Sequence, residues 1–166
     1  MENNYAFIDA QNLYLSIKEL GWRIDYRKFR KYLSDKYNVK KAILFIGFMP
    51  ENQPLYDELQ QAGYHLVYKP KVPYYNKEKG KKETKGNVDA ELVLYSAAIM
   101  YQEYDKAIIV TGDGDFQCLI KYLYDNQKLK AVLIPNKSKF SSLLKYKYIK
   151  PYHRFVSDLE KRIKYV

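Results

Sequence analysis

Cysteine and long apolar runs are scarce in this chain, and each shortage excludes a class of protein. Cys118 is the only cysteine among 166 residues, which excludes an internal disulfide and a zinc cluster built from cysteines. The longest apolar runs, such as residues 42–48, fall far short of the roughly 18 residues that a membrane span needs. The N-terminus shows no basic segment followed by an apolar stretch, as a secretory signal would. We therefore expect a cytoplasmic protein that makes no use of a membrane.

Histidine and nucleotide-binding motifs are also scarce. The two histidines, His65 and His153, stand far along the chain from any serine or cysteine that would complete a catalytic triad. A Walker loop and a G-x-G-x-x-G turn are both absent. A phosphatase with Asp9 as nucleophile would need a second aspartate two residues later, where Gln11 stands. These absences remove the commonest catalytic and nucleotide-binding patterns.

Positive charge is abundant and unevenly distributed. The formal net charge is +10, and residues 26–41, 69–86 and 137–166 together carry more than that, so the rest of the chain is net acidic. A basic surface around an acidic focus suits a polyanion held beside a cation site. The composition has a second interpretation, because an AT-rich genome also encodes 19 tyrosines together with many lysines, asparagines and isoleucines.

Short apolar runs alternate with helical patterns along the chain, which predicts an α/β fold. We expect a three-layer α/β/α sandwich with a mostly parallel, doubly wound central sheet, formed by residues 1–166 as one domain. Residues 69–86 are predicted to be a long basic loop. Strands are predicted at 5–9, 42–48, 65–68, 107–111 and 131–134, and helices at 12–20, 26–37, 54–62, 88–99, 116–124, 141–145 and about 154–164.

Four aspartates fall at the carboxyl edge of this predicted sheet, where ligands of such folds bind. Asp9 closes the first strand, and Asp113 and Asp115 follow the fourth. Asp89 begins a helix, and helices of β-α-β units start at that same edge. We therefore expect the four carboxylates to converge. For Asp9 taken alone, the simpler interpretation is a cap for the helix that follows.

Several like charges in one pocket repel one another strongly, so the cluster predicts a divalent cation. Oxygen ligands alone suit Mg²⁺ or Mn²⁺. Asn12 can add an amide oxygen or orient a water, and Thr111 can hydrogen-bond a carboxylate. Gly112 and Gly114 are expected to give the turn backbone conformations that other residues avoid, so that both neighbouring aspartates point to one place.

Three motifs resemble those of the NYN domains, which are PIN-like ribonucleases, in their bacterial LabA-like branch. They are Phe7-Ile8-Asp9 with Asn12, Lys85-Gly86-Asn87-Val88-Asp89, and Thr111-Gly112-Asp113-Gly114-Asp115-Phe116. The resemblance spans residues 4 to 150 and implies a PIN-like fold and metal-dependent cleavage of RNA. Carried over by position, it implies that the catalytic residues are Asp9, Asp89, Asp113 and Asp115 with Asn12, and that the four aspartates bind the metal. The chain departs from the family pattern at Asn87, which separates the Lys-Gly pair from Val88.

The resulting hypothesis is a ribonuclease that uses Mg²⁺ or Mn²⁺ to hydrolyse single-stranded RNA and leaves a 5′-phosphate. The basic loop is expected to hold RNA by charge and by stacking, through Lys69, Lys71, Tyr74, Tyr75, Lys81, Lys82 and Lys85, unless it is only a solvated hairpin. One alternative is a module of the same fold that binds RNA or protein with little or no catalysis. Another is a Mg²⁺-dependent phosphatase of small phosphoesters. The abundance of tyrosine leaves homodimerisation open.

Overall fold

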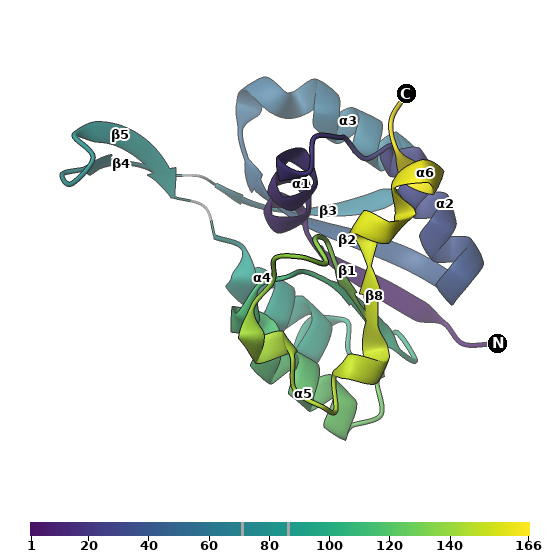
Figure 1. The fold of residues 1–166 in the computed structure, drawn as a ribbon. Coiled ribbons are helices and arrows are strands. Elements are labelled where there is room, and N and C mark those ends of the chain that lie inside the picture. Colours follow the sequence, from purple (N-terminus) through teal and green to yellow (C-terminus); the bar gives the residue numbers. More distant parts are fainter. Residues whose placement is uncertain (71, 86) are drawn as a thin grey trace.

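The computed structural model describes residues 1–70, 72–85 and 87–166, without the side chains of residues 82–85, and its centre is a six-stranded sheet (Figure 1). Every neighbouring pair of strands in this sheet is parallel. The strand order is β3-β2-β1-β6-β7-β8, with β1 at Asn4–Asp9, β2 at Val39–Phe48, β3 at Tyr64–Pro70, β6 at Ala107–Val110, β7 at Leu129–Ile134 and β8 at His153–Phe155.

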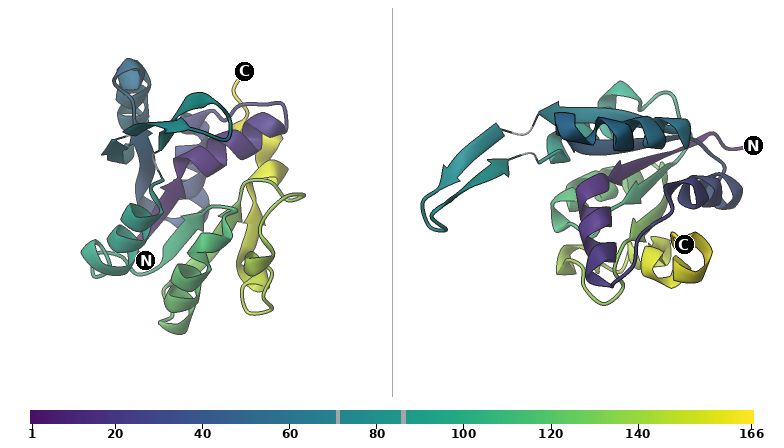
Figure 2. Two further views of the ribbon diagram at one scale, coloured as in Figure 1. Left: turned by 90° about the vertical axis from the view of Figure 1, so that its left-hand side faces the viewer. Right: turned by 90° about the horizontal axis from the view of Figure 1, so that it is seen from above.

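Helices cover both faces of the sheet, as Figure 2 shows. One face packs against α1 (Ala10–Glu19), α2 (Tyr26–Tyr37) and α3 (Gln53–Gln61), and the other against α4 (Asp89–Leu94) and α5 (Gln117–Asp125). Strand β1 serves both cores, because Ala6 and Ile8 are buried on the first face while Tyr5 and Phe7 are buried on the second. The predicted α/β/α fold class is therefore confirmed.

The chain doubles back at β1, and this reversal positions the site described below. From β1 the chain proceeds through α1 and α2 to β2 and then through α3 to β3, whereas β6 pairs with the opposite edge of β1. Right-handed crossovers in opposite directions place their helices on opposite faces of the sheet. Loops from both faces therefore meet at the carboxyl ends of β1 and β6.

The predicted loop at residues 69–86 is instead largely a β-hairpin. β4 (Val72–Asn76) and β5 (Lys81–Lys85) pair antiparallel as a separate two-stranded sheet that projects from the body (Figure 1). The turn between them is fixed locally, because the Asn76 side-chain oxygen accepts the N–H groups of Glu78 and Lys79 and Gly80 adopts a φ of +63°. The strands were not predicted from the sequence because this segment is rich in charged residues.

The predicted last helix at 154–164 is also wrong in extent. The segment contains β8, a 3₁₀ turn at Val156–Leu159 and only a short α6 (Glu160–Ile163). Phe155 packs against one core while Val156 is buried in the other. Adjacent residues point to opposite faces in an extended chain and not on a helix. Packing against both cores therefore requires an extended chain at this position.

The helix predicted at 88–99 is present but changes geometry after Leu94, where a π-helical turn, η2 (Tyr95–Ile99), follows α4. Within residues 1–70, 72–85 and 87–166, no helix has the length and apolar character that crossing a membrane requires.

Candidate metal centre

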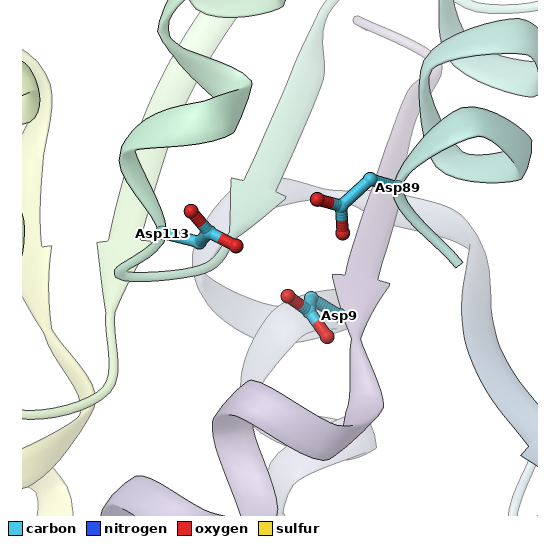
Figure 3. Close-up of side chains that lie close together, drawn as sticks. All are labelled: Asp9, Asp89 and Asp113. Carbon is cyan, nitrogen blue, oxygen red and sulfur yellow. The ribbon is translucent and has the colours of Figure 1, made fainter. Parts of the chain in front are cut away.

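Three carboxylates that are distant in the sequence meet at the carboxyl edge of the sheet. Asp9 ends β1, Asp89 begins α4, and Asp113 follows β6 at the start of a 3₁₀ turn, η3 (Gly114–Phe116). Each contributes one carboxylate oxygen to a group in which all these oxygens lie within 4.8 Å of one another (Figure 3). Figure 3 shows the three side chains converging from three different elements.

Asp9 caps the helix that follows it and also lies in the carboxylate group. Its Oδ1 accepts the Asn12 backbone N–H at 3.2 Å and so caps α1. Its Oδ2 accepts a hydrogen bond from the Thr111 hydroxyl at 3.3 Å. The side chain is fixed from both sides and remains part of the carboxylate group.

Burial makes the charge of Asp9 costly. The residue is only 6% exposed. Burial raises the pKa of Asp9 to about 6, the hydrogen bond from Asn12 opposes this, and the nearby charges of Asp89 and Asp113 raise it further. A carboxylate with this pKa is half protonated at about pH 6, and a bound cation would favour its charged form.

Asp89 is placed by Asn87, the residue that departs from the family pattern. The Asn87 side-chain oxygen accepts the Asp89 backbone N–H at 2.7 Å. Burial raises the pKa of Asp89, the charge of Asp113 adds to the effect, and a hydrogen bond from the Asn87 side chain opposes it. Asn87 therefore holds the first turn of α4 in position next to the other carboxylates.

Hydrogen bonds tie the turn that carries Asp113 to its neighbours. The Asp113 N–H donates to the Thr111 hydroxyl at 3.1 Å, and its Oδ1 accepts the Asp115 N–H at 2.9 Å. The Asn12 side-chain oxygen accepts the Gly112 N–H at 2.9 Å, so it joins α1 to this turn. Asn12 and Thr111 thus position the turn and the carboxylates around it.

Asp115, the fourth predicted ligand, lies beside the group but not in it. Its side chain is exposed, and it is absent from the set of mutually close oxygens among the described residues. Its charge still reaches Asp89, whose pKa it helps to raise.

The two glycines of this turn have a different role from the predicted one. Neither Gly112 nor Gly114 has a positive φ. Gly114 is required for space, because a Cβ there would lie 2.2 Å from Ser141 Oγ and 2.9 Å from Ser141 Cβ. The Ser141 N–H also donates to the Gly112 carbonyl at 3.1 Å, so the segment after β7 closes tightly on the turn. No motif in the sequence indicated a role for Ser141, because that role depends on this contact.

The predicted RNA-binding residues are spread over β3 and the hairpin. Lys69 on β3 forms an ion pair with Glu91 of α4 at 3.4 Å, a contact that was not predicted from the sequence. Tyr74 and Tyr75 on β4 are 42% and 60% exposed, and Lys81 on β5 is exposed. Lys71 lies outside the described residues, as do the side chains of Lys82 and Lys85.

The donor set fits a hard divalent cation. All donors are carboxylate oxygens, which Mg²⁺ and Mn²⁺ prefer, and they come close enough to share one ion. Glu91 adds to the negative charge nearby, since it helps to raise the pKa of Asp89 and its buried Oε2 has no hydrogen-bond partner in the described part of the chain. Asp9, Asp89 and Asp113 are thus able to hold a cation together.

Comparisons with known proteins agree with this description. The NYN domain family matches the chain over residues 5–150. The low amplitude and bright protein LabA of Synechococcus elongatus is 26% identical over 126 residues, which cover 73% of this chain and 67% of LabA. The crystal structure of a protein of unknown function from Vibrio parahaemolyticus superposes with a TM-score of 0.74 at 19% identity, covering 99% of this chain and 96% of that one. This last similarity concerns the fold alone.

Proposed function

The chain belongs to the NYN domain family, and from this premise we propose that it is a divalent-cation-dependent ribonuclease. Its substrate in this proposal is single-stranded RNA, and its reaction is hydrolysis of a phosphodiester bond to leave a 5′-phosphate. The proposed place of action is the cytoplasm.

The observation that carries the proposal is the convergence of Asp9, Asp89 and Asp113. At the largest separation of their oxygens, 4.8 Å, two unit charges repel by about 3 kcal/mol at an effective dielectric constant near 20. Three such pairs are costly to maintain for a structural purpose alone. A divalent cation removes this cost, and its presence would explain why the fold keeps the three carboxylates together.

The proposed metal ligands are Asp9, Asp89 and Asp113, with Asp115 at the exposed border of the site. Mg²⁺ or Mn²⁺, when bound, would supply Lewis-acid activation of water and compensate the charge of the scissile phosphate. The chain's own residues provide the orientation. Thr111 and the first turn of α1 hold Asp9, and Asn12 holds the turn that presents Asp113.

The hairpin is the proposed RNA-binding surface. It projects from the end of the sheet where β3 ends and α4 begins, and Asp89 is the first residue of α4 (Figure 1). Exposed Tyr74 and Tyr75 offer faces for base stacking, worth about 1–3 kcal/mol per base. The proposed phosphate-binding cations are Lys69, Lys71, Lys81, Lys82 and Lys85.

The experiment is an RNA cleavage assay with Asp113→Asn. Wild type should shorten an end-labelled single-stranded RNA in Mn²⁺ and not in EDTA. The variant should lose at least about 100-fold in rate, because loss of a partner that only orients a metal ligand already costs about 10–100-fold.

Asp125→Asn is the matched control, since Asp125 is an exposed aspartate of α5 that pairs with Lys121. Its cleavage rate should equal that of wild type. Equal rates for Asp113→Asn and wild type would refute the proposal. RNA binding of similar strength in EDTA without any shortening in Mn²⁺ would identify a binding module, and faster hydrolysis of a chromogenic phosphate monoester than of RNA would identify a phosphatase.

A further inference from the structure

A cavity of about 740 Å³ lies on the face of the sheet that carries α1 and α3. Its walls come from α1, from the segment between α1 and α2, from α3 and from Tyr165 near the C-terminus. Figure 1 shows these elements grouped around one region, with α3 above α1 and the C-terminus beside them. Sites for small organic ligands occupy roughly 300–1,000 Å³, so the cavity has a suitable size.

Aliphatic side chains make up the largest part of the cavity wall, and five aromatic residues add rings and polar groups to it. Tyr14 is half exposed, whereas Trp22 and Tyr56 are almost fully buried. The aromatic lining residues are Tyr14, Trp22, Tyr26, Tyr56 and Tyr165. The Trp22 indole N–H and the Tyr26 hydroxyl are hydrogen-bond donors of this lining. Burial, with the nearby Tyr14 hydroxyl, raises the pKa of Tyr26 to about 12, so this hydroxyl keeps its proton at neutral pH.

Two arginines add positive charge to the cavity wall. Arg23 and Arg27 are exposed and line the cavity, and the Arg23 guanidinium lies 4.6 Å from the centre of the Tyr165 ring. Arginine binds phosphate groups well because its planar donors match their oxygens. Asp25 and Glu58 line the same wall, so the wall carries no formal net charge. The arginines offer local donors for a phosphate, and the aromatic rings offer surfaces for a planar base.

The cavity and the three carboxylates share one structural element. Ala10 and Gln11 line the cavity and directly follow Asp9 in the chain. All three lie within one turn at the start of α1, whose pitch is about 5.4 Å. The part of the cavity that Ala10 and Gln11 line therefore lies beside Asp9, on the route of a strand that crosses the carboxylates.

We propose that this cavity holds an unpaired nucleobase of the RNA strand whose backbone crosses the three carboxylates. The proposal rests on the proposed function and adds to it a subsite for the substrate. Bound in this way, the base fixes the position of the neighbouring phosphate. It also limits cleavage to RNA that is not base-paired at that nucleotide.

Trp22 makes the proposal directly measurable, because it is the only tryptophan of the chain and lines the cavity. The probe is a single-stranded RNA of about eight nucleotides, within the roughly 4–16 nucleotides that compact single-strand-binding folds cover. It is titrated in EDTA, so that no cleavage occurs, while Trp22 fluorescence is followed. Fluorescence should be quenched to saturation, and replacing one nucleotide by an abasic residue should abolish the quenching at a single position along the strand.

Tyr14→Ala tests the stacking surface without disturbing the core, because Tyr14 is 48% exposed. RNA affinity should fall about 5- to 100-fold, as loss of one stacked base predicts. Tyr122→Ala is the matched control, since Tyr122 is 43% exposed and lies on α5 against the other core. Its affinity should equal that of wild type, and circular dichroism should show both variants folded.

Three results would overturn the proposal. They are RNA binding without a change in Trp22 fluorescence, equal affinity of wild type and Tyr14→Ala, and quenching by a nucleoside monophosphate but not by RNA. Cleavage in Mn²⁺ is measured separately, so the two proposals fail separately. Cleavage by wild type without quenching refutes the subsite alone, whereas position-dependent quenching without cleavage refutes the nuclease alone.

Discussion

Asp9 is subject to opposing effects on the charge of its carboxylate. Two hydrogen bonds stabilise its carboxylate, while burial and two neighbouring carboxylates destabilise the charge. Burial is the largest of these effects, and the result is a pKa of about 6. In the metal-free protein, Asp9 therefore opposes folding at neutral pH.

The first prediction concerns Asp9→Asn in EDTA. Because the pKa of Asp9 is higher in the folded protein than the ordinary value of 3.8, its favourable contribution is complete below about pH 4 and is lost as the pH rises through 6. An asparagine keeps an oxygen to cap α1 and carries no charge. The variant should gain up to about 3 kcal/mol in free energy of unfolding at pH 8 and little at pH 4.

Urea denaturation at both pH values measures this difference. Asp125→Asn, on the exposed face of α5, should show no such dependence on pH. A variant Asp9→Asn that is less stable than wild type at pH 8 would show that the carboxylate charge is already compensated without a metal.

The second prediction concerns the space around Gly114. A methyl group there meets Ser141 Oγ at 2.2 Å and Leu143 Cβ at 3.1 Å, so Gly114→Ala should lose about 1–3 kcal/mol of stability, as overpacked sites do. Gly112→Ala is the matched control, since its nearest contact would be an ordinary 3.4 Å to Phe140 Cβ. Thermal unfolding should rank Gly112→Ala above Gly114→Ala, and the reverse order would contradict the steric account.

Predictions about the positions of single residues were correct where the order and direction of the strands determine which residues lie close together. The convergence of Asp9, Asp89 and Asp113 followed from the positions of strand ends, a rule that needs no side-chain detail. The role of Gly114 was misjudged because it depends on Ser141, 27 positions later, and the contact appears only when the chain is folded. The same reason explains why the ion pair between Lys69 and Glu91 was missed.

Among the elements, the β4–β5 hairpin stands apart from the rest of the fold. It forms its own two-stranded sheet and projects from the body in Figure 1 and in the right-hand view of Figure 2. Among the described residues its two strands pair only with each other, and its turn is held by its own residues Asn76 and Gly80. We therefore expect it to contribute to binding more than to stability.

The third prediction is the effect of replacing residues 72–85 by a short Gly-Ser linker. The unfolding temperature should stay close to that of wild type, while RNA affinity in EDTA should fall at least about 10-fold through lost stacking and charge. The dependence of affinity on salt should weaken as well, because fewer phosphate contacts remain. Tyr75→Ala alone should reproduce part of the loss with an unchanged salt dependence. Unchanged affinity of the deletion variant would assign RNA binding to another surface.

Helices and strands were predicted more accurately from the sequence when one of their faces is buried. α2 was predicted with its observed bounds at Tyr26–Tyr37, because Phe29, Leu33 and Tyr37 recur at helical spacing. In the structure Asp25 caps its start, and Asn38, with a φ of 53°, ends it. β8 was not predicted, because it has only three residues and only Phe155 among them packs against a core, so the segment shows no periodicity. The conformation of such a short edge strand depends on the residues that pack around it.

In the whole molecule, the two layers of helices meet at the carboxylate group. Asp9 joins β1 to α1 on one face of the sheet, and Asp89 begins α4 on the other. A cation held between them would link both layers, and its binding would stabilise the fold as a unit.

The fourth prediction is stabilisation of the protein by Mn²⁺ or Mg²⁺. A ligand at 100 times its Kd that binds only the folded state adds about 2.7 kcal/mol, so the unfolding temperature should rise with cation concentration. Asp113→Asn should abolish the rise, and KCl of equal ionic strength should not produce it. An equal rise in wild type and Asp113→Asn would place the cation elsewhere.

The central claim is that Asp9, Asp89 and Asp113 hold a divalent cation in common. Anomalous diffraction from a crystal soaked in Mn²⁺ tests it most directly. The account predicts one strong peak about 2 Å from an oxygen of each of these three side chains. A map with Mn²⁺ bound at other sites and no peak among these carboxylates would contradict it.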